Sequence, residues 1–160
     1  MDSLPFVMQS QDHDRWCWAA VASSISESYN LTSDFSQCRI VSAQPARPPN
    51  CCDNPLPDGC DEYGFLENAL NTTENLNGDP VTRSLSFAEV VEQIRQRTPV
   101  GVRMQFPNSA HFIVITGVDE QTQFVHVEDS LHGPSDATYV EFRDNYLGSG
   151  SWSDSYLTRG

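Results

Sequence analysis

The sequence contains no lysine. All nine basic residues are arginine, against 22 acidic residues, and the formal net charge is −13. A surface of that charge repels phosphate backbones, so we do not expect a nucleic acid partner. The missing lysines have two interpretations: the compositional bias of a GC-rich or acid-adapted source, or selection against lysine modification in a toxin that enters a eukaryotic cytosol. We favour the compositional interpretation, because one sequence does not separate drift from selection.

Long apolar runs are also missing. The longest, around residues 112–118, has the length of a strand and not of a membrane span, so no membrane association is expected. No basic segment followed by an apolar one opens the sequence, so no signal peptide is visible there. The length of 160 residues, with 38% apolar and 10% aromatic residues, predicts a single domain over residues 1–160 with one buried core. We expect that domain to be a monomer.

The five cysteines are unevenly placed along the chain. One of the five cysteines, Cys17, stands apart from a proline-rich stretch that holds the others: Cys38, Cys51, Cys52 and Cys60. An even cluster and one isolated thiol predict two disulfides and one free cysteine. Neighbours in sequence are not expected to bond to each other, which leaves Cys38 with one of the adjacent pair and Cys60 with the other. Zinc is the alternative, but the stretch lacks a second Cys-x-x-Cys knuckle and a nearby histidine, so we expect no metal and no other cofactor. Disulfides form in oxidising compartments, which indicates a secreted protein.

The apolar pattern changes its period in the middle of the chain. Helices are predicted over residues 16–29, 35–43 and 62–70, and from the capping box Ser86-Phe87-Ala88-Glu89 to Thr98. Strands are predicted over residues 100–106, 111–118, 124–129, 138–142 and 153–158. Helices followed by antiparallel strands predict an α+β domain of two layers. A groove between the layers is the natural place for a site.

Cys17 has the first property of a catalytic nucleophile. It stands in the run Arg-Trp-Cys-Trp-Ala-Ala, at the predicted start of the first helix. The thiolate is the nucleophilic form of cysteine, and the unpaired amides and dipole of a helix N-terminus stabilise an anion.

A cysteine nucleophile needs an imidazole close by and an acceptor that orients it. Of the four histidines, His111 opens the predicted central strand and can face a helix start across a groove; the others are His13, His126 and His132. Asp129 ends the next strand with the parity of its buried face, so we expect it to orient His111. Glu128, which points the other way, is the fallback.

The oxyanion of the reaction needs hydrogen-bond donors. The Cys17 backbone amide is one candidate, and the side-chain amide of Gln11, six residues earlier, is the second. Gln9 lies close by and is the competing choice. The alternative is that Gln11 has no role in the reaction and is only solvated, as glutamines in polar loops usually are.

These residues lie within longer sequence motifs. In chain order the segments are Gln11-x5-Cys17-Trp18-Ala19-Ala20, Gln37-Cys38, Cys51-Cys52 with Cys60, Pro99-Val100-Gly101-Val102, His111 to Gly117, Val127-Glu128-Asp129 and Gly150-Ser151-Trp152. They resemble papain-like cysteine peptidases, in particular the bacterial secreted branch that is similar to the avirulence effector proteases of plant pathogens. The likeness covers most of the chain.

The resemblance implies a papain-like α+β fold, with an N-terminal helical layer packed on a C-terminal antiparallel sheet, and thiol peptidase activity on proteins or peptides. It implies that Cys17 is the nucleophile, His111 the base, Asp129 the orienting residue and Gln11 the oxyanion donor. Two positions depart from the family pattern. Ser109-Ala110 stand where glycines are expected before the histidine, and Ser130 stands where a proline is expected after the aspartate.

Two other functions are compatible with this sequence. The same thiol site could serve an amidase, a deamidase, a transglutaminase or a peptidoglycan hydrolase, including a toxin delivered into a target cell and held in check by an inhibitor or immunity protein. The second is an inactive binding module on the same scaffold.

Overall fold

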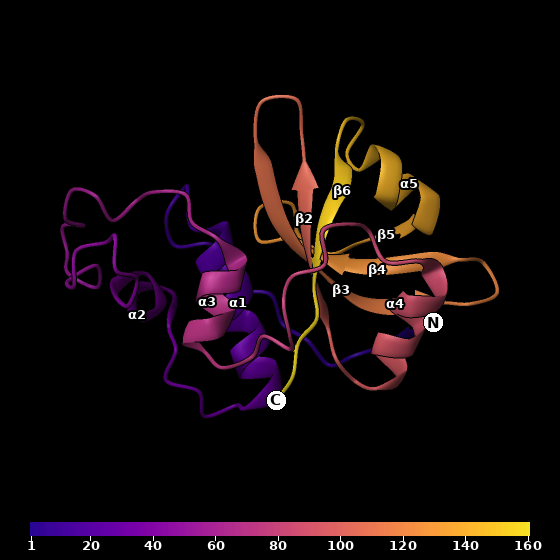
Figure 1. The fold of residues 1–160 in the computed structure, drawn as a ribbon, viewed down its shortest axis with the longest axis horizontal. Coiled ribbons are helices and arrows are strands. Elements are labelled where there is room, and N and C mark those ends of the chain that lie inside the picture. The colour runs from indigo at the N-terminus through magenta and orange to yellow at the C-terminus, as the bar shows by residue number, and fades with distance from the viewer.

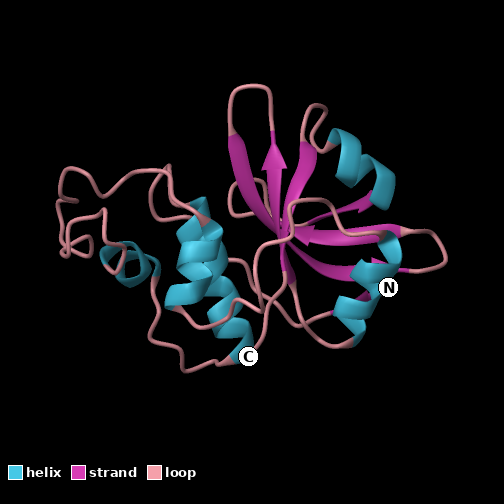
Figure 2. Cartoon of the chain, in the orientation of Figure 1, coloured by secondary structure: helices cyan, strands magenta, loops and turns pink.

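A helical layer and a sheet layer lie side by side in the computed structural model, which describes residues 1–160 (Figure 1). Figure 2 shows helices grouped on one side of the molecule and others beside the sheet. The helices are α1 (Cys17–Tyr29), α2 (Gln37–Ser42), α3 (Leu66–Thr72), α4 (Phe87–Arg95) and α5 (Tyr139–Asn145). The strands are β1 (Asp2–Ser3), β2 (Val100–Gln105), β3 (Ala110–Asp119), β4 (Phe124–Glu128), β5 (Ser135–Thr138) and β6 (Ser151–Tyr156). The predicted α+β fold of papain-like layout is confirmed. No helix has both the length and the apolar character needed to span a membrane.

The sheet is antiparallel throughout, in the order β5-β4-β3-β2-β6, with β1 added on β3. Its central strand is the apolar run around residues 112–118, as the nearly continuous β-branched pattern predicts. The side chains of β3 alternate between two hydrophobic clusters. Phe112 and Val114 pack with the helical layer, whereas Ile113 and Ile115 pack with α4 and α5 on the other face. This alternation brings the first residues of β3 to the junction of the two layers.

Helix α1 is buried along most of its length. Its small residues Ala19, Ala20 and Ala22 have no exposed surface, and the helix packs against α2, α3 and β3. Small side chains allow such close approach on several sides, which larger residues would prevent. Burial of this helix holds its first residue, Cys17, in a defined position against the sheet.

Helix α3 begins later than predicted, at Leu66. The preceding residues Tyr63, Gly64 and Phe65 run past the ring of Trp18, so closely that a Cβ atom on Gly64 would lie 2.4 Å from it. Only glycine fits there without displacement of the indole. The approach leaves Tyr63 and Phe65 exposed at the edge of the groove.

The strand predicted over residues 138–142 is wrong. Residues 139–145 form helix α5, and Thr138 ends β5 and caps the helix by accepting a hydrogen bond from the Glu141 amide. Tyr139 and Phe142 are both buried, and their separation of three residues places them on one face of a helix. The cap and this spacing outweigh the strand preference of the aromatic and β-branched residues in the segment.

Two disulfides join the proline-rich segment, as the cysteine count predicts. Cys38 is bonded to Cys52 and Cys51 to Cys60, while Cys17 is the one free cysteine. Cys51 and Cys60 are buried in the core of the helical layer, whereas Cys38 is only partly buried at its edge. The two bridges therefore differ in packing more than in loop length.

We expect removal of the Cys51–Cys60 bridge to cost more stability than removal of the Cys38–Cys52 bridge. Their loops span 9 and 14 residues, and this difference in loop length changes the loop-closure contribution by less than about 0.5 kcal/mol. Loss of the buried bridge also opens a cavity in the core. Urea unfolding of the two double variants, Cys51→Ala/Cys60→Ala and Cys38→Ala/Cys52→Ala, measures both costs, which we expect at about 2–5 kcal/mol each. Equal losses would show that the core packing of the buried bridge contributes nothing.

Candidate active site

Cys17 is the first residue of α1 and only 4% exposed. No side chain caps this helix, its first turn holds no acidic residue, and the Cys17 amide has no acceptor within the protein. No other negatively charged or capping side chain therefore interacts with the positive end of the helix dipole, where the Cys17 thiol lies. Negative charge that develops at this position during a reaction is stabilised by the free amides of the helix start.

His111 lies near the start of β3, at the groove between the layers. Its Nε2 is 2.7 Å from Oδ1 of Asp129, in a buried contact, which leaves Nδ1 for Cys17. Burial by itself lowers the pKa of His111, but hydrogen bonds and charge interactions with Asp129 and Cys17 raise it to about 9. The imidazole is therefore protonated at neutral pH, as an ion pair with a thiolate requires.

Asp129 has no exposed side-chain surface and accepts hydrogen bonds at both oxygens. Oδ1 accepts from His111 and from the Leu131 and His132 amides, at 2.7, 2.8 and 3.1 Å. Burial opposes the charge of the carboxylate, but the hydrogen bond with His111 and the positive charge on it hold the pKa of Asp129 well below its usual range. A charged Asp129 fixes the His111 tautomer that carries a proton on Nε2.

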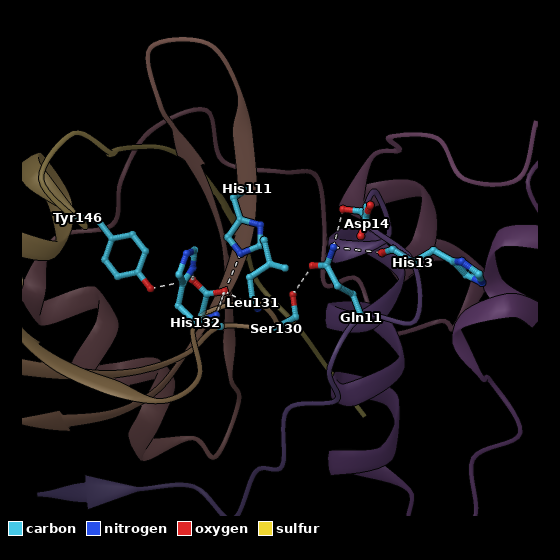
Figure 3. Close-up of polar contacts among 9 residues, drawn as sticks. Gln11, His13, Asp14, His111, Ser130, Leu131, His132 and Tyr146 are labelled. Carbon is cyan, nitrogen blue, oxygen red and sulfur yellow. Dashed lines mark hydrogen bonds and ion pairs between the residues drawn. The ribbon is translucent and has the colours of Figure 1, made fainter.

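Two further side chains hold Asp129, through contacts that the sequence does not predict. Tyr146 donates its hydroxyl hydrogen to Oδ2 at 2.8 Å, in a buried contact, and His132 Nδ1 lies 3.1 Å from the same oxygen. Figure 3 shows His111, His132 and Tyr146 gathered around one point on the sheet side of the site. His132 is one of the four histidines available as a base, but nothing in the local sequence indicates that it or Tyr146, just after α5, contacts this carboxylate.

The remaining candidates for the base lie elsewhere. His13 stacks edge-on against Trp16, with 4.4 Å between ring centroids, and His126 is held by Asp136 and Glu128 on the sheet surface. The fallback residue Glu128 therefore contacts His126 and not His111. Of the four histidines, His111 and His132 line the cavity that contains Cys17.

Gln11 lies beside Cys17, on the helical side of the groove. Its Nε2 donates to the carbonyl oxygens of His13 and Asp14, at 3.1 and 2.6 Å, and its Oε1 accepts from the Ser130 hydroxyl at 2.9 Å. The bond to Ser130 crosses the groove and joins the two layers (Figure 3). Both amide hydrogens are occupied, so an oxyanion role for Gln11 requires one of them to turn toward Cys17, and this role stays a prediction. The competing Gln9 bonds to Ser23 and Ser24 on α1 instead.

Two cavities share Cys17 as a wall, with volumes of about 290 and 330 Å³. The first lies on the His132 side and includes Leu131 and Leu147, and the second lies on the side of Gly64 and Phe65. Half of the exposed large apolar side chains of the protein line these two cavities: Tyr63, Phe65, Leu131 and Leu147. A larger polar cavity of about 450 Å³, at the far end of α1, contains neither the thiol nor the imidazole.

The side chains of His111, Asp129 and His132 form the one group of potential metal ligands in the protein, with ligand atoms within 4.8 Å of one another. Hydrogen bonds inside the group account for these positions, because each imidazole contacts a different carboxylate oxygen. The arrangement is that of one buried carboxylate hydrogen-bonded to two imidazoles.

The site combines a thiol at an uncapped helix start with an imidazole on an antiparallel sheet, and a buried carboxylate orients that imidazole. This combination defines the class of the protein as the papain-like cysteine peptidases. The family model described as papain-like cysteine protease AvrRpt2 matches residues 2–147, and the chain belongs to this family. It is thus a cysteine peptidase, whose substrates are proteins or peptides. A search of curated protein sequences found no match to the chain.

Proposed function

We propose that the protein is an endopeptidase that hydrolyses peptide bonds through an acyl-enzyme on Cys17, with His111 as acid and base. The observation that carries this proposal is the buried contact of 2.7 Å between His111 and Asp129, which leaves the other imidazole nitrogen for the hydrogen bond with Cys17. Burial of a charged imidazole and carboxylate costs free energy, and groups whose pKa is perturbed in this way cluster at functional sites.

In the acylation step the Cys17 sulfur attacks the peptide carbonyl carbon and forms a C–S bond. The negative charge that develops on the carbonyl oxygen is stabilised by the unpaired Cys17 amide, with a Gln11 N–H as the expected second donor. His111 then transfers its proton to the amide nitrogen, the C–N bond breaks, and the amine product leaves.

In the deacylation step neutral His111 accepts a proton from water, whose oxygen attacks the thioester carbon. The C–S bond breaks, the acid product leaves, and the imidazolium is restored beside the thiolate. Asp129 keeps its negative charge throughout and stabilises the imidazolium of His111.

Internal cleavage is supported by the cavities on both sides of Cys17. A substrate chain that continues in both directions from the scissile bond finds apolar surface at either end. We also propose that residues 1–160 act as one peptidase domain, because Cys17 and His111 come from different layers. The two disulfides support an oxidising, extracellular compartment.

The test is incubation of the protein with an unfolded protein substrate, followed by mass spectrometry of the products. We expect new peptides that end at internal positions of the substrate. Mass shifts without cleavage would instead indicate a deamidase or a transglutaminase, and removal of terminal residues only would indicate an exopeptidase. Either result would contradict the proposal.

A further inference from the structure

Arg103 is the only charged side chain that lines the 330 Å³ cavity beside Cys17. Three aromatic side chains, Tyr63, Phe65 and Phe112, line the same cavity, and Asn108 and Ser109 add polar groups to its wall. A guanidinium among aromatic side chains is costly to desolvate unless it finds an acceptor. The contacts of Arg103 therefore indicate what this cavity receives.

The register of the sheet directs Arg103 to this cavity. On β2 the residues Val102 and Met104 are buried on the face of α4, so Arg103 points to the opposite face. Its partner on β3 is Phe112, and its partner on β6 is Asp154. Arg103 thus stands between an aromatic ring and a carboxylate on the sheet face that borders the groove.

Few of the Arg103 donors are used within the protein. Nη1 donates to the Ser153 hydroxyl at 2.9 Å, and the nearest carboxylate oxygen, from Asp154, lies 3.9 Å away. This is the longest ion pair in the structure and has no hydrogen bond, whereas Arg95 places its guanidinium 2.9 Å from Glu120. A guanidinium carries several N–H groups in a planar fork that matches a carboxylate. Arg103 therefore keeps N–H groups that have no acceptor within the protein and are open to the cavity, since its side chain is 33% exposed.

We infer that this cavity selects an acidic substrate side chain, glutamate in particular, whose carboxylate pairs with Arg103. The inference rests on the proposed peptidase function, because it places the cavity in the substrate groove. The methylene groups of glutamate lie against the aromatic side chains, and its carboxylate accepts hydrogen bonds from the guanidinium N–H groups that have no acceptor within the protein. Asp154 partly offsets the charge of Arg103, and the net charge of −13 repels acidic peptides at a distance. The selectivity therefore arises from direct contact within the cavity.

The experiment starts from a peptide that the protein cleaves. Each residue near its scissile bond is replaced in turn by Glu, by Gln and by Leu, and kcat/KM is measured for every peptide. Gln has the shape of Glu without the charge, so the Glu to Gln ratio isolates the carboxylate. At one position we expect this ratio to be about 10, the advantage typical of a charge-assisted pair. In Arg103→Met the ratio at that position should fall to about 1.

Arg95→Met is the matched control, since it removes one arginine from α4, on the other face of the sheet. We expect it to keep the ratio of the unchanged protein. Arg103→Gln provides a second variant, and thermal melting shows whether each variant is folded. A ratio near 1 at every position in the unchanged protein, or a preference for Glu that survives in both folded Arg103 variants, would overturn the inference while leaving the peptidase function intact. Failure to cleave any peptide would instead overturn the proposed function, and the inference with it.

Discussion

Replacement of Cys17 by alanine is expected to abolish peptide hydrolysis and to leave the protein folded. Cys17 is the one free cysteine of the protein and lines the groove, and loss of a nucleophile in such an enzyme lowers kcat on the order of 10⁴-fold to 10⁶-fold. Alanine fits the first position of a buried helix and removes a single side-chain atom. The measurement is kcat/KM on a cleaved peptide, together with the thermal unfolding temperature.

The control for this prediction tests the environment of the thiol. Iodoacetamide should alkylate Cys17 faster in the unchanged protein than in His111→Ala, because the imidazolium favours the thiolate. An inactive binding module predicts equal rates in both proteins. Hydrolysis that persists in Cys17→Ala would disprove the nucleophilic role.

The second large effect is expected from Asp129. We predict that Asp129→Ala lowers kcat/KM by about 10³-fold or more, since His111 loses the acceptor that fixes its tautomer. The Tyr146 hydroxyl and the His132 imidazole lose their shared acceptor as well, so the variant should also be less stable. Steady-state kinetics and urea unfolding on the same preparation separate the two losses.

Asp129→Asn separates the charge of the carboxylate from its position. The amide oxygen still accepts the His111 N–H, so more activity should remain than in Asp129→Ala.

The pH profile of the same variant tests the charge. The pKa of His111 is raised to about 9 with the help of the Asp129 charge, and the thiolate–imidazolium pair is lost as the pH rises through that pKa. Removal of the charge lowers the pKa of His111, and the alkaline limb of the kcat/KM profile should move to lower pH. The shift is partial, because Cys17 still raises this pKa. An alkaline limb that stays in place in Asp129→Asn would show that the Asp129 charge does not tune the imidazole.

Interactions between residues close in sequence make much of the secondary structure predictable. The capping box at Ser86 opens α4 as predicted, because its hydrogen bonds lie within four consecutive residues. The periodicity of β3 likewise needs only the neighbouring residues. Where local signals compete, prediction is weaker: at Thr138 the helix cap overrides a strand-like run. The late start of α3, at Leu66, follows the close approach of Gly64 to the ring of Trp18, a contact between residues far apart in the sequence.

The sequence by itself determined the α+β layout, the cysteine pairing up to the choice within the adjacent pair, and the family resemblance that assigns roles to Cys17, His111 and Asp129. Those features depend on periodicity, residue count and motif spacing, all of which are local or ordered along the chain. Only the tertiary structure decided that Tyr146 and His132 hold Asp129, that Ser130 ties Gln11 across the groove, and that Arg103 enters the cavity beside Cys17. These contacts depend on strand register and on the packing of α5 and the loops, because they join residues whose local sequence contains no sign of their partners.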